Sequence, residues 1–155
     1  MRIHALASGV TVVTLAMLAA ACSTAPLGPS HLDTKNDACA SCRMPVSDPG
    51  LSAQLVAPGE EPKFFDDIGC LREFLASKGA SAGSVAYVAD HRTRVWIRAA
   101  EALYTRQESL ATPMDSHLMA HEGQRSRDED PAARGGGMLG PRDLFGPGGA
   151  PAGRR

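Results

Sequence analysis

The chain has 155 residues, with 16 Lys and Arg against 17 Asp and Glu, so its formal net charge is −1. A nucleic-acid partner requires a clear basic excess, which is missing here, so we expect no nucleic acid among the partners. The length admits one ordinary domain and excludes a large multidomain enzyme. An apolar content of 43% excludes a wholly disordered chain, whereas 16 Gly and 11 Pro indicate that part of it has no core.

The first 21 residues have the pattern of a secretory signal peptide. Arg2 gives a basic start, residues 5–21 carry no charge, and small residues precede Cys22. The apolar stretch is short and rich in Ala, Ser, Gly and Thr, which disfavours a membrane-spanning helix. The letters LAAAC that end at Cys22 resemble a bacterial lipobox, and this resemblance implies that Cys22 is lipidated and becomes the mature N-terminus.

Lipidation at Cys22 places the mature protein outside the cytoplasm. We therefore expect an exported protein whose acyl chains hold it on a membrane facing the periplasm, the outer membrane if the source is Gram-negative. Residues 22–37 are rich in Ser, Pro and Asp and are predicted to be a lipidated tether between the membrane and the fold.

Residues 38–122 are predicted to form one compact α+β domain of two small tandem ββα units, at about residues 51–79 and 85–104. In each unit two short apolar strands precede a short helix, so the order of elements repeats although the residue identities barely match. Residues 123–155 contain nine Gly, four Pro and six Arg. Such a composition offers little apolar surface to bury, so we expect a disordered C-terminal tail.

The helix of the first unit is indicated by apolar residues at positions i, i+3 and i+7, with Asp66 or Asp67 as its cap and Gly79 as its end. The predicted strands are 51–57, 63–65, 85–88 and 94–97, and the predicted helices are about 66–79 and 98–104.

Three thiols remain for chemistry if Cys22 is lipidated, and an odd number does not form a closed disulfide framework. Cys39 and Cys42 form a CxxC pair, and Met44 follows two residues later. A segment rich in Met and His comes near the end of the predicted domain, at residues 112–121. Thiolate, thioether and imidazole are the donors that the soft ion Cu(I) favours, and thioether neither needs deprotonation nor forms disulfides. If residues 42 and 44 lie in a strand, both side chains share one face and can converge on one ion.

These residues also have ordinary structural interpretations. A methionine commonly fills a core, and a cysteine in an amphipathic helix is more often a small buried side chain. Aspartates before a helix commonly cap it, and a histidine in a turn or loop is commonly solvated. The residues concerned are Met44, Met119, Cys70, Asp66, Asp67, His91, His117 and His121.

Two other functions fit the cysteines. An extracytoplasmic thiol–disulfide oxidoreductase could use Cys39 and Cys42, but such a pair commonly opens a helix, and Pro45 favours an extended backbone here. A structural zinc-binding module could combine Cys39, Cys42, Cys70 and one histidine.

Several blocks of the sequence together resemble the NosL family of nitrous oxide reductase accessory lipoproteins, over about residues 16–121. The resemblance implies a fold of two related ββα units and a periplasmic Cu(I) chaperone that supplies copper for nitrous oxide reductase, an enzyme of denitrification. The blocks are the lipobox, CASCRMPVSD at 39–48, FFDDIGCL at 64–71, AYVAD at 86–90, VWIRAAEA at 95–102 and TPM at 112–114.

The metal motif of that family is Cys-Gly-Met, which stands here as Cys42-Arg43-Met44. The resemblance makes Cys42 and Met44 copper ligands and adds Met114 through the TPM block. Cys39 belongs to a CxxC variant of the family and serves as an extra ligand or a resolving thiol. If the family's glycine permits a positive φ, Arg43 occupies a backbone position that a side chain disfavours.

The leading hypothesis is a Cu(I) carrier without enzymatic turnover, whose low coordination number leaves a position open for an incoming ligand. The expected partners are a copper acceptor, nitrous oxide reductase or a related cuproprotein, and membrane-associated copper-supply machinery. The expected ligands are Cys42, Met44, Met114, His117, which we add from its place beside the TPM block, and Cys39.

Overall fold

The computed structural model of the protein describes residues 27–153, so the predicted signal peptide and Cys22 lie outside the described residues. Two antiparallel sheets and a few short helices make up this part, as the predicted α+β class requires. No helix among the described residues is both long and apolar enough to cross a membrane. The elements are β1 (Ala53–Val56), β2 (Lys63–Phe65), α1 (Ile68–Lys78), β3 (Val85–Ala89), β4 (Trp96–Arg98), β5 (Leu103–Arg106), β6 (Leu118–His121), α2 (Gln124–Asp128), the 3-10 helix η1 (Pro131–Ala133), β7 (Gly137–Leu139) and α3 (Pro141–Phe145).

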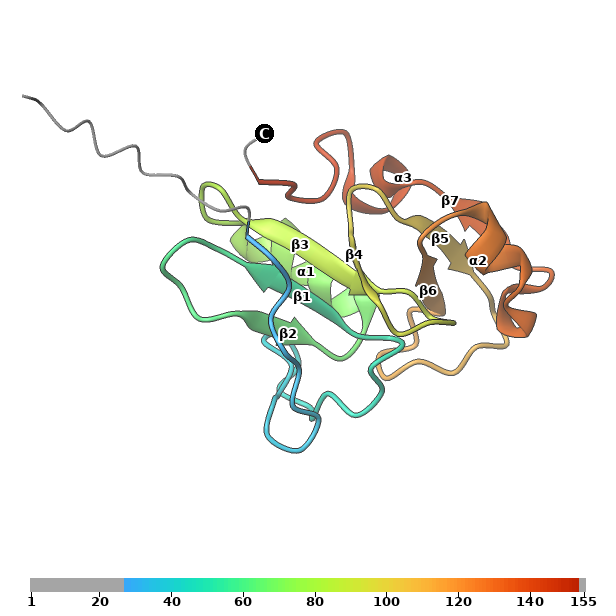
Figure 1. Cartoon of the computed structure of the whole chain (residues 1–155), viewed down its shortest axis with the longest axis horizontal. Helices are drawn as coiled ribbons and strands as arrows, with labels where there is room; N and C mark the ends of the chain where they lie inside the picture. The colour runs from blue at the N-terminus through green and yellow to red at the C-terminus, as the bar shows by residue number, and fades with distance from the viewer. Residues whose placement is uncertain (1–26, 154–155) are drawn as a thin grey trace, which may run out of the picture.

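The first sheet has the order β2-β1-β3-β4, and α1 lies behind it in Figure 1. Successive side chains of a strand point to opposite faces. In β3, Ala86 and Val88 therefore join the main core, whereas Val85 and Tyr87 join a smaller apolar cluster with the N-terminal Leu27. The Tyr87 hydroxyl donates a hydrogen bond to the Leu27 carbonyl, so the segment before the thiols is fastened to this sheet.

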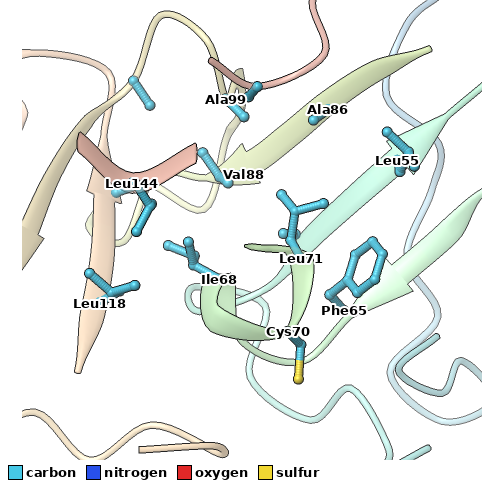
Figure 2. Close-up of a cluster of buried hydrophobic side chains, with 14 of the residues drawn as sticks. Leu55, Phe65, Ile68, Cys70, Leu71, Ala86, Val88, Ala99, Leu118 and Leu144 are labelled. Atoms are coloured by element: carbon cyan, nitrogen blue, oxygen red, sulfur yellow. The ribbon is translucent and has the colours of Figure 1, made fainter. Parts of the chain in front are cut away.

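The first predicted ββα unit is present as β1, β2 and α1. Asp67 caps α1, since its Oδ1 accepts a hydrogen bond from the Gly69 N–H at 2.6 Å. Gly79 ends the helix with a φ of +73°, a left-handed conformation that favours glycine. Ile68 and Leu71 are fully buried against the sheet, so the predicted apolar face of the helix is correct (Figure 2).

The second ββα unit is not at residues 85–104. β3 and β4 pair as a hairpin of the first sheet, but the Ala-rich stretch after them makes only one turn at residues 99–101 before β5 begins. Leu103 to Arg106 instead pair with β6 and with β7, and these tertiary contacts override the helix propensity of the preceding alanines. The strand-strand-helix order recurs further along the chain, as β5, β6 and α2.

The expectation that residues 123–155 are disordered is wrong for the described part of them, residues 123–153. This segment forms α2, η1, β7 and α3 around the second sheet, whose order is β6-β5-β7 (Figure 1). Leu144 lies in the main core beside Ile68 and Leu118 (Figure 2), and the Phe145 ring packs edge-on against Tyr104 with centroids 5.8 Å apart. A few apolar residues spaced among the glycines thus anchor the segment, and the folded region extends beyond the predicted boundary at residue 122.

Candidate metal centre

The CxxC pair and Met44 lie in a tight loop that is closed on itself and attached to β2. The Cys39 N–H donates to the Met44 carbonyl at 2.8 Å, and the Arg43 N–H donates to the Cys39 carbonyl at 3.0 Å. The Ala40 N–H donates to the Phe64 carbonyl at 2.8 Å, so the loop is held beside the strand. Residues 40–42 form a turn rather than a strand, so the argument that Cys42 and Met44 share one strand face does not apply.

The middle residue of the Cys42-Arg43-Met44 motif has a left-handed backbone. The φ of Arg43 is +69°, which explains why glycine suits this position and why the loop can turn between the thiol and the thioether. A residue with a Cβ adopts this conformation at a cost of about 1–2 kcal/mol. The Arg43 side chain is exposed and does not enter the loop.

Arg43→Gly is therefore expected to stabilise the protein by about 1 kcal/mol, because glycine removes the steric conflict between Cβ and the backbone. Arg43→Ala retains Cβ and is expected to leave the free energy of unfolding nearly unchanged. Urea unfolding followed by circular dichroism measures both values. Equal stability of the glycine and alanine variants would show that the loop is not strained at this residue.

Four side chains with metal-binding atoms meet where this loop approaches the start of α1. The cluster, which we call the thiol site, is formed by Cys39, Cys42, Asp66 and Cys70, and their ligand atoms all lie within 4.8 Å of one another. The Cys42 thiol donates to both Asp66 carboxylate oxygens, at 3.3 and 3.4 Å. Cys39, Asp66 and Cys70 are buried, whereas Cys42 is partly exposed, so the site has one accessible side.

Two members of the thiol site were assigned structural roles from the sequence. Cys70 is buried as expected for a small core residue, but its sulfur points away from the neighbouring core side chains and joins the cluster (Figure 2). Asp66 lies one residue before the true helix cap, Asp67, and faces Cys42 instead. Asp66 precedes the extended N-cap residue Asp67, so helical spacing does not relate it to Cys70, and no spacing in the sequence indicates that the two side chains meet.

Two thiols of the site, Cys42 and Cys70, have raised pKa values. Burial raises the pKa of Cys42 to about 11, helped by hydrogen bonds with Cys39 and Asp66 and opposed by one from the Met44 backbone. Burial, with the hydrogen bond to Asp66, also raises the pKa of Cys70. The three described cysteines are free thiols. At neutral pH Cys42 and Cys70 are therefore poor nucleophiles, and a metal must displace their protons to bind.

The other predicted ligands are two exposed methionines and His117, and His117 is not a member of the thiol site. Met44 and Met114 are unusually exposed for methionine, at 56% and 46% of their surface. The Met114 N–H donates to Asp67 Oδ2 at 3.0 Å, so the TPM block is fastened to the residue that caps α1. His117 Nδ1 lies 2.8 Å from the Leu110 carbonyl oxygen, a contact that uses one of its two ring nitrogens.

A glycine in the first turn of α1 allows the TPM block to approach closely. A Cβ added to Gly69 would lie 2.8 Å from Ser116 Cβ, too short for a real contact, and 3.0 Å from Asp67 Oδ1, a tight contact. Gly69 precedes Cys70 directly, so the loop that carries Met114 is packed against the helix turn that carries a thiol of the site.

The remaining side chains named from the sequence have clear places. Met119 is fully buried in β6, which agrees with its interpretation as a core residue. His121 is also fully buried, and the side chain of His91 is only 16% exposed, so the expectation that both are solvated is wrong. Both rings contact Asp130, and this group shares no residue with the thiol site.

Comparison with known proteins agrees with the resemblance seen in the sequence blocks. No curated protein and no solved structure matches the chain significantly. The sequence model of the NosL family matches residues 30–144, which include every member of the thiol site, the TPM block and most of the segment after residue 122. That match covers well over half of the chain, and the protein therefore belongs to the NosL family.

Proposed function

We propose that the protein is a membrane-anchored Cu(I) chaperone that delivers copper for the maturation of nitrous oxide reductase or a related cuproprotein. The observation that carries this proposal is the convergence of three thiols and one carboxylate within 4.8 Å, with one thiol partly exposed. Membership of the NosL family supports a role in copper binding.

The donor set suits a soft monovalent ion. Thiolates favour Cu(I) and Zn²⁺ over harder cations, and thioethers add a preference for Cu(I). Cys42 is at the accessible side of the thiol site, and Met44 follows it after the left-handed turn at Arg43. Met114 offers a second exposed thioether from the block fastened to Asp67.

Exposure of these donors supports transfer rather than permanent storage. A structural metal site is closed on all sides by its ligands, whereas a carrier needs a position that an acceptor can attack. In our proposal, Cys39, Cys42 and Cys70 supply thiolates, and the exposed Met44 and Met114 complete the site or receive the ion first. An acceptor ligand then displaces the thioethers, and copper leaves by stepwise ligand exchange.

The geometry gives less support to a thiol–disulfide oxidoreductase. Such enzymes lower the pKa of the attacking thiol, commonly at a helix N-terminus. Here burial raises the pKa of Cys42 to about 11, and the CxxC pair lies in a loop 26 positions before the first helix begins at Ile68. A Cys3Asp zinc site fits the four donors of the thiol site, so zinc is the competing cargo that an experiment must address.

The cellular setting belongs to the proposal as well. Lipidation at Cys22, outside the described residues, would hold the carrier on a membrane facing the periplasm, close to copper-supply machinery. Cys22→Ala is expected to move the protein from the membrane fraction to the soluble fraction of cells, as measured by immunoblot after fractionation. Recovery of the variant with the membranes would reject the lipid anchor.

The decisive test is to load the reduced protein anaerobically with Cu(I) and to record X-ray absorption at the copper edge. We expect one tightly bound equivalent with predominantly sulfur neighbours, in competition with a chromophoric Cu(I) chelator. A copper spectrum with only nitrogen and oxygen neighbours would reject the thiol site as the copper site. Purification with one equivalent of sulfur-bound Zn²⁺ that Cu(I) does not displace would establish the zinc module instead.

A further inference from the structure

A second group of metal-binding side chains lies where the turn after β3 meets the second sheet. His121 is the last residue of β6, His91 follows β3 by two positions, and Asp130 directly precedes η1. His91 Nδ1 lies 2.6 Å and His121 Nε2 lies 3.0 Å from the same atom, Asp130 Oδ2. One ligand atom from each of the three residues lies within 4.8 Å of the other two.

The backbone holds these three side chains in place independently of one another. The His91 N–H donates to the Ala120 carbonyl at 2.8 Å, which ties the turn after β3 to the strand that carries His121. Asp130 caps η1, because its Oδ1 accepts from the Ala132 N–H at 2.9 Å and leaves Oδ2 free to face the two rings. The group is therefore preorganised by a sheet and a capped turn.

The hydrogen bonding of His121 is incomplete in every protonation state. Its Nδ1 is the one buried side-chain nitrogen or oxygen without a partner among residues 27–153. If Nε2 carries the proton and donates to Asp130, the Nδ1 lone pair has no hydrogen-bond donor. If Nδ1 carries the proton, the lone pair of Nε2 faces the Asp130 carboxylate, and the Nδ1–H has no acceptor. An unpaired buried polar group costs about 1–3 kcal/mol, so a fully buried histidine in β6 calls for an explanation beyond packing.

We propose that His91, His121 and Asp130 form a second metal site, selective for a borderline divalent cation of the Zn²⁺ class and separate from the thiol site. Two imidazole nitrogens and one carboxylate oxygen are donors that Zn²⁺ accepts readily, and the carboxylate together with the lack of sulfur favours Zn²⁺ over Cu(I). Coordination of His121 through Nε2 exchanges one hydrogen bond for a metal–nitrogen bond and leaves the ring proton on Nδ1. The free energy of metal binding then offsets the cost of the buried, unpartnered Nδ1–H.

Access and coordination number also fit such an ion. The side chain of His91 is 16% exposed and those of His121 and Asp130 are 0% and 5% exposed, so the site opens to solvent only beside His91. Three protein ligands leave a fourth tetrahedral position for water on that side. Because its ligands come from three separate segments, a bound ion would fasten the η1 region to β6 and to the turn after β3.

The test uses Zn²⁺ with the full chain, and Co²⁺ as a spectroscopic substitute. Co²⁺ at this site gives weak visible bands only, whereas Co²⁺ at the thiol site also gives intense sulfur-to-metal charge-transfer absorption. We expect wild-type protein to bind one Zn²⁺ without sulfur ligands and to melt at a higher temperature with Zn²⁺. We expect Asp130→Asn, which keeps the capping oxygen, and His91→Ala to lower the Zn²⁺ affinity on the order of 100-fold.

His31→Ala is the matched control, because His31 is an exposed histidine outside the group, and it should bind Zn²⁺ as wild type does. His121→Phe fills a buried position with an apolar ring and should abolish this equivalent while the charge-transfer band of the thiol site persists. An unchanged number of Zn²⁺ equivalents in both His91→Ala and Asp130→Asn would overturn the proposal. The proposal would also be overturned if every Co²⁺ ion that wild type binds gave charge-transfer absorption, because all binding would then be at the thiol site.

Discussion

Replacement of Cys42 by serine is expected to lower the Cu(I) affinity of the protein by about 100- to 1000-fold. A four-ligand structural metal site contributes about 10–16 kcal/mol, so one strong ligand is worth about 3–4 kcal/mol. Cys42 is the thiol at the accessible side of the site, and serine can still donate to the Asp66 carboxylate, so the loop should keep its shape. Anaerobic competition with a chromophoric Cu(I) chelator measures the affinity.

Two methionines provide a matched pair for the thioether contribution. Met44 and Met138 are 56% and 55% exposed, so replacement by leucine changes exposed apolar surface equally at both places. Met44→Leu is expected to lower the Cu(I) affinity about 10-fold, because a thioether is a weaker ligand than a thiolate. Met138→Leu should leave it unchanged. If Cys42→Ser binds Cu(I) within twofold of wild type, copper is held elsewhere.

The parts of the fold that the sequence predicts well are those that local patterns determine. The Asp67 cap, the apolar face of α1 and the Gly79 end lie within 13 residues of one another and define the helix almost alone. The second unit was misplaced because the alanines at 99 and 100 favour a helix locally, whereas β5 forms through pairing with β6 and β7. Pairing between strands that are far apart in the sequence is not visible in the pattern of a short stretch of residues.

The C-terminal segment shows why composition alone misleads. Its glycines and prolines lower the mean apolar content, but Leu144 and Phe145 each reach the core or its edge. At the end of the described chain, the Ala86 N–H donates to the Pro151 carbonyl at 2.8 Å and the Gly153 N–H donates to the Ser84 carbonyl at 2.8 Å. The mean composition of these 33 residues does not reveal that a few apolar side chains and backbone hydrogen bonds hold the segment on the fold.

For the metal centre, the sequence indicated that sulfur atoms would be the donors, but it did not identify all the residues that supply donor atoms. The CxxC pair was visible from its spacing, and the structure brings Cys39 and Cys42 together. Cys70 and Asp66 join them only because β2 and the start of α1 pass beside the loop, which no sequence spacing reports. His91, His121 and Asp130 are similarly close only through the pairing of two sheets.

The aspartate that ends AYVAD, one of the blocks that resemble the NosL family, gains a physical role from the structure. Asp90 is fully buried and accepts four hydrogen bonds. Oδ1 accepts from the N–H groups of Arg92 and Thr93 at 3.0 and 2.9 Å, which shape the turn after β3. Oδ2 accepts from the Glu122 N–H and the Ser126 hydroxyl, both at 2.7 Å, at the junction of β6 and α2. Asp90 thus joins the two sheets.

Asp90→Asn is consequently expected to destabilise the protein by about 3 kcal/mol, because the amide nitrogen must face hydrogen-bond donors in a buried place. Burial would raise the pKa of Asp90, but hydrogen bonds from Ser126, Glu122 and Thr93 outweigh it and lower the pKa to about 2. Because the pKa of Asp90 is lower in the folded than in the unfolded chain, its carboxylate stabilises the fold fully at pH values above the unfolded pKa. This contribution of about 2 kcal/mol is lost as the pH falls from about 4 to 2.

Urea unfolding between pH 7 and pH 2 therefore distinguishes an ionised Asp90 from a merely well-packed one. Wild type should lose stability steeply over the acid range, whereas Asp90→Asn should start lower and fall less, since it has no proton to gain at this position. Asp128→Asn, at a side chain 57% exposed in a surface ion pair with Arg127, should lie within about 0.5 kcal/mol of wild type throughout. Parallel acid curves for wild type and Asp90→Asn would mean that the carboxylate charge does not hold the sheets together, and that other acids, Asp130 first among them, govern the loss.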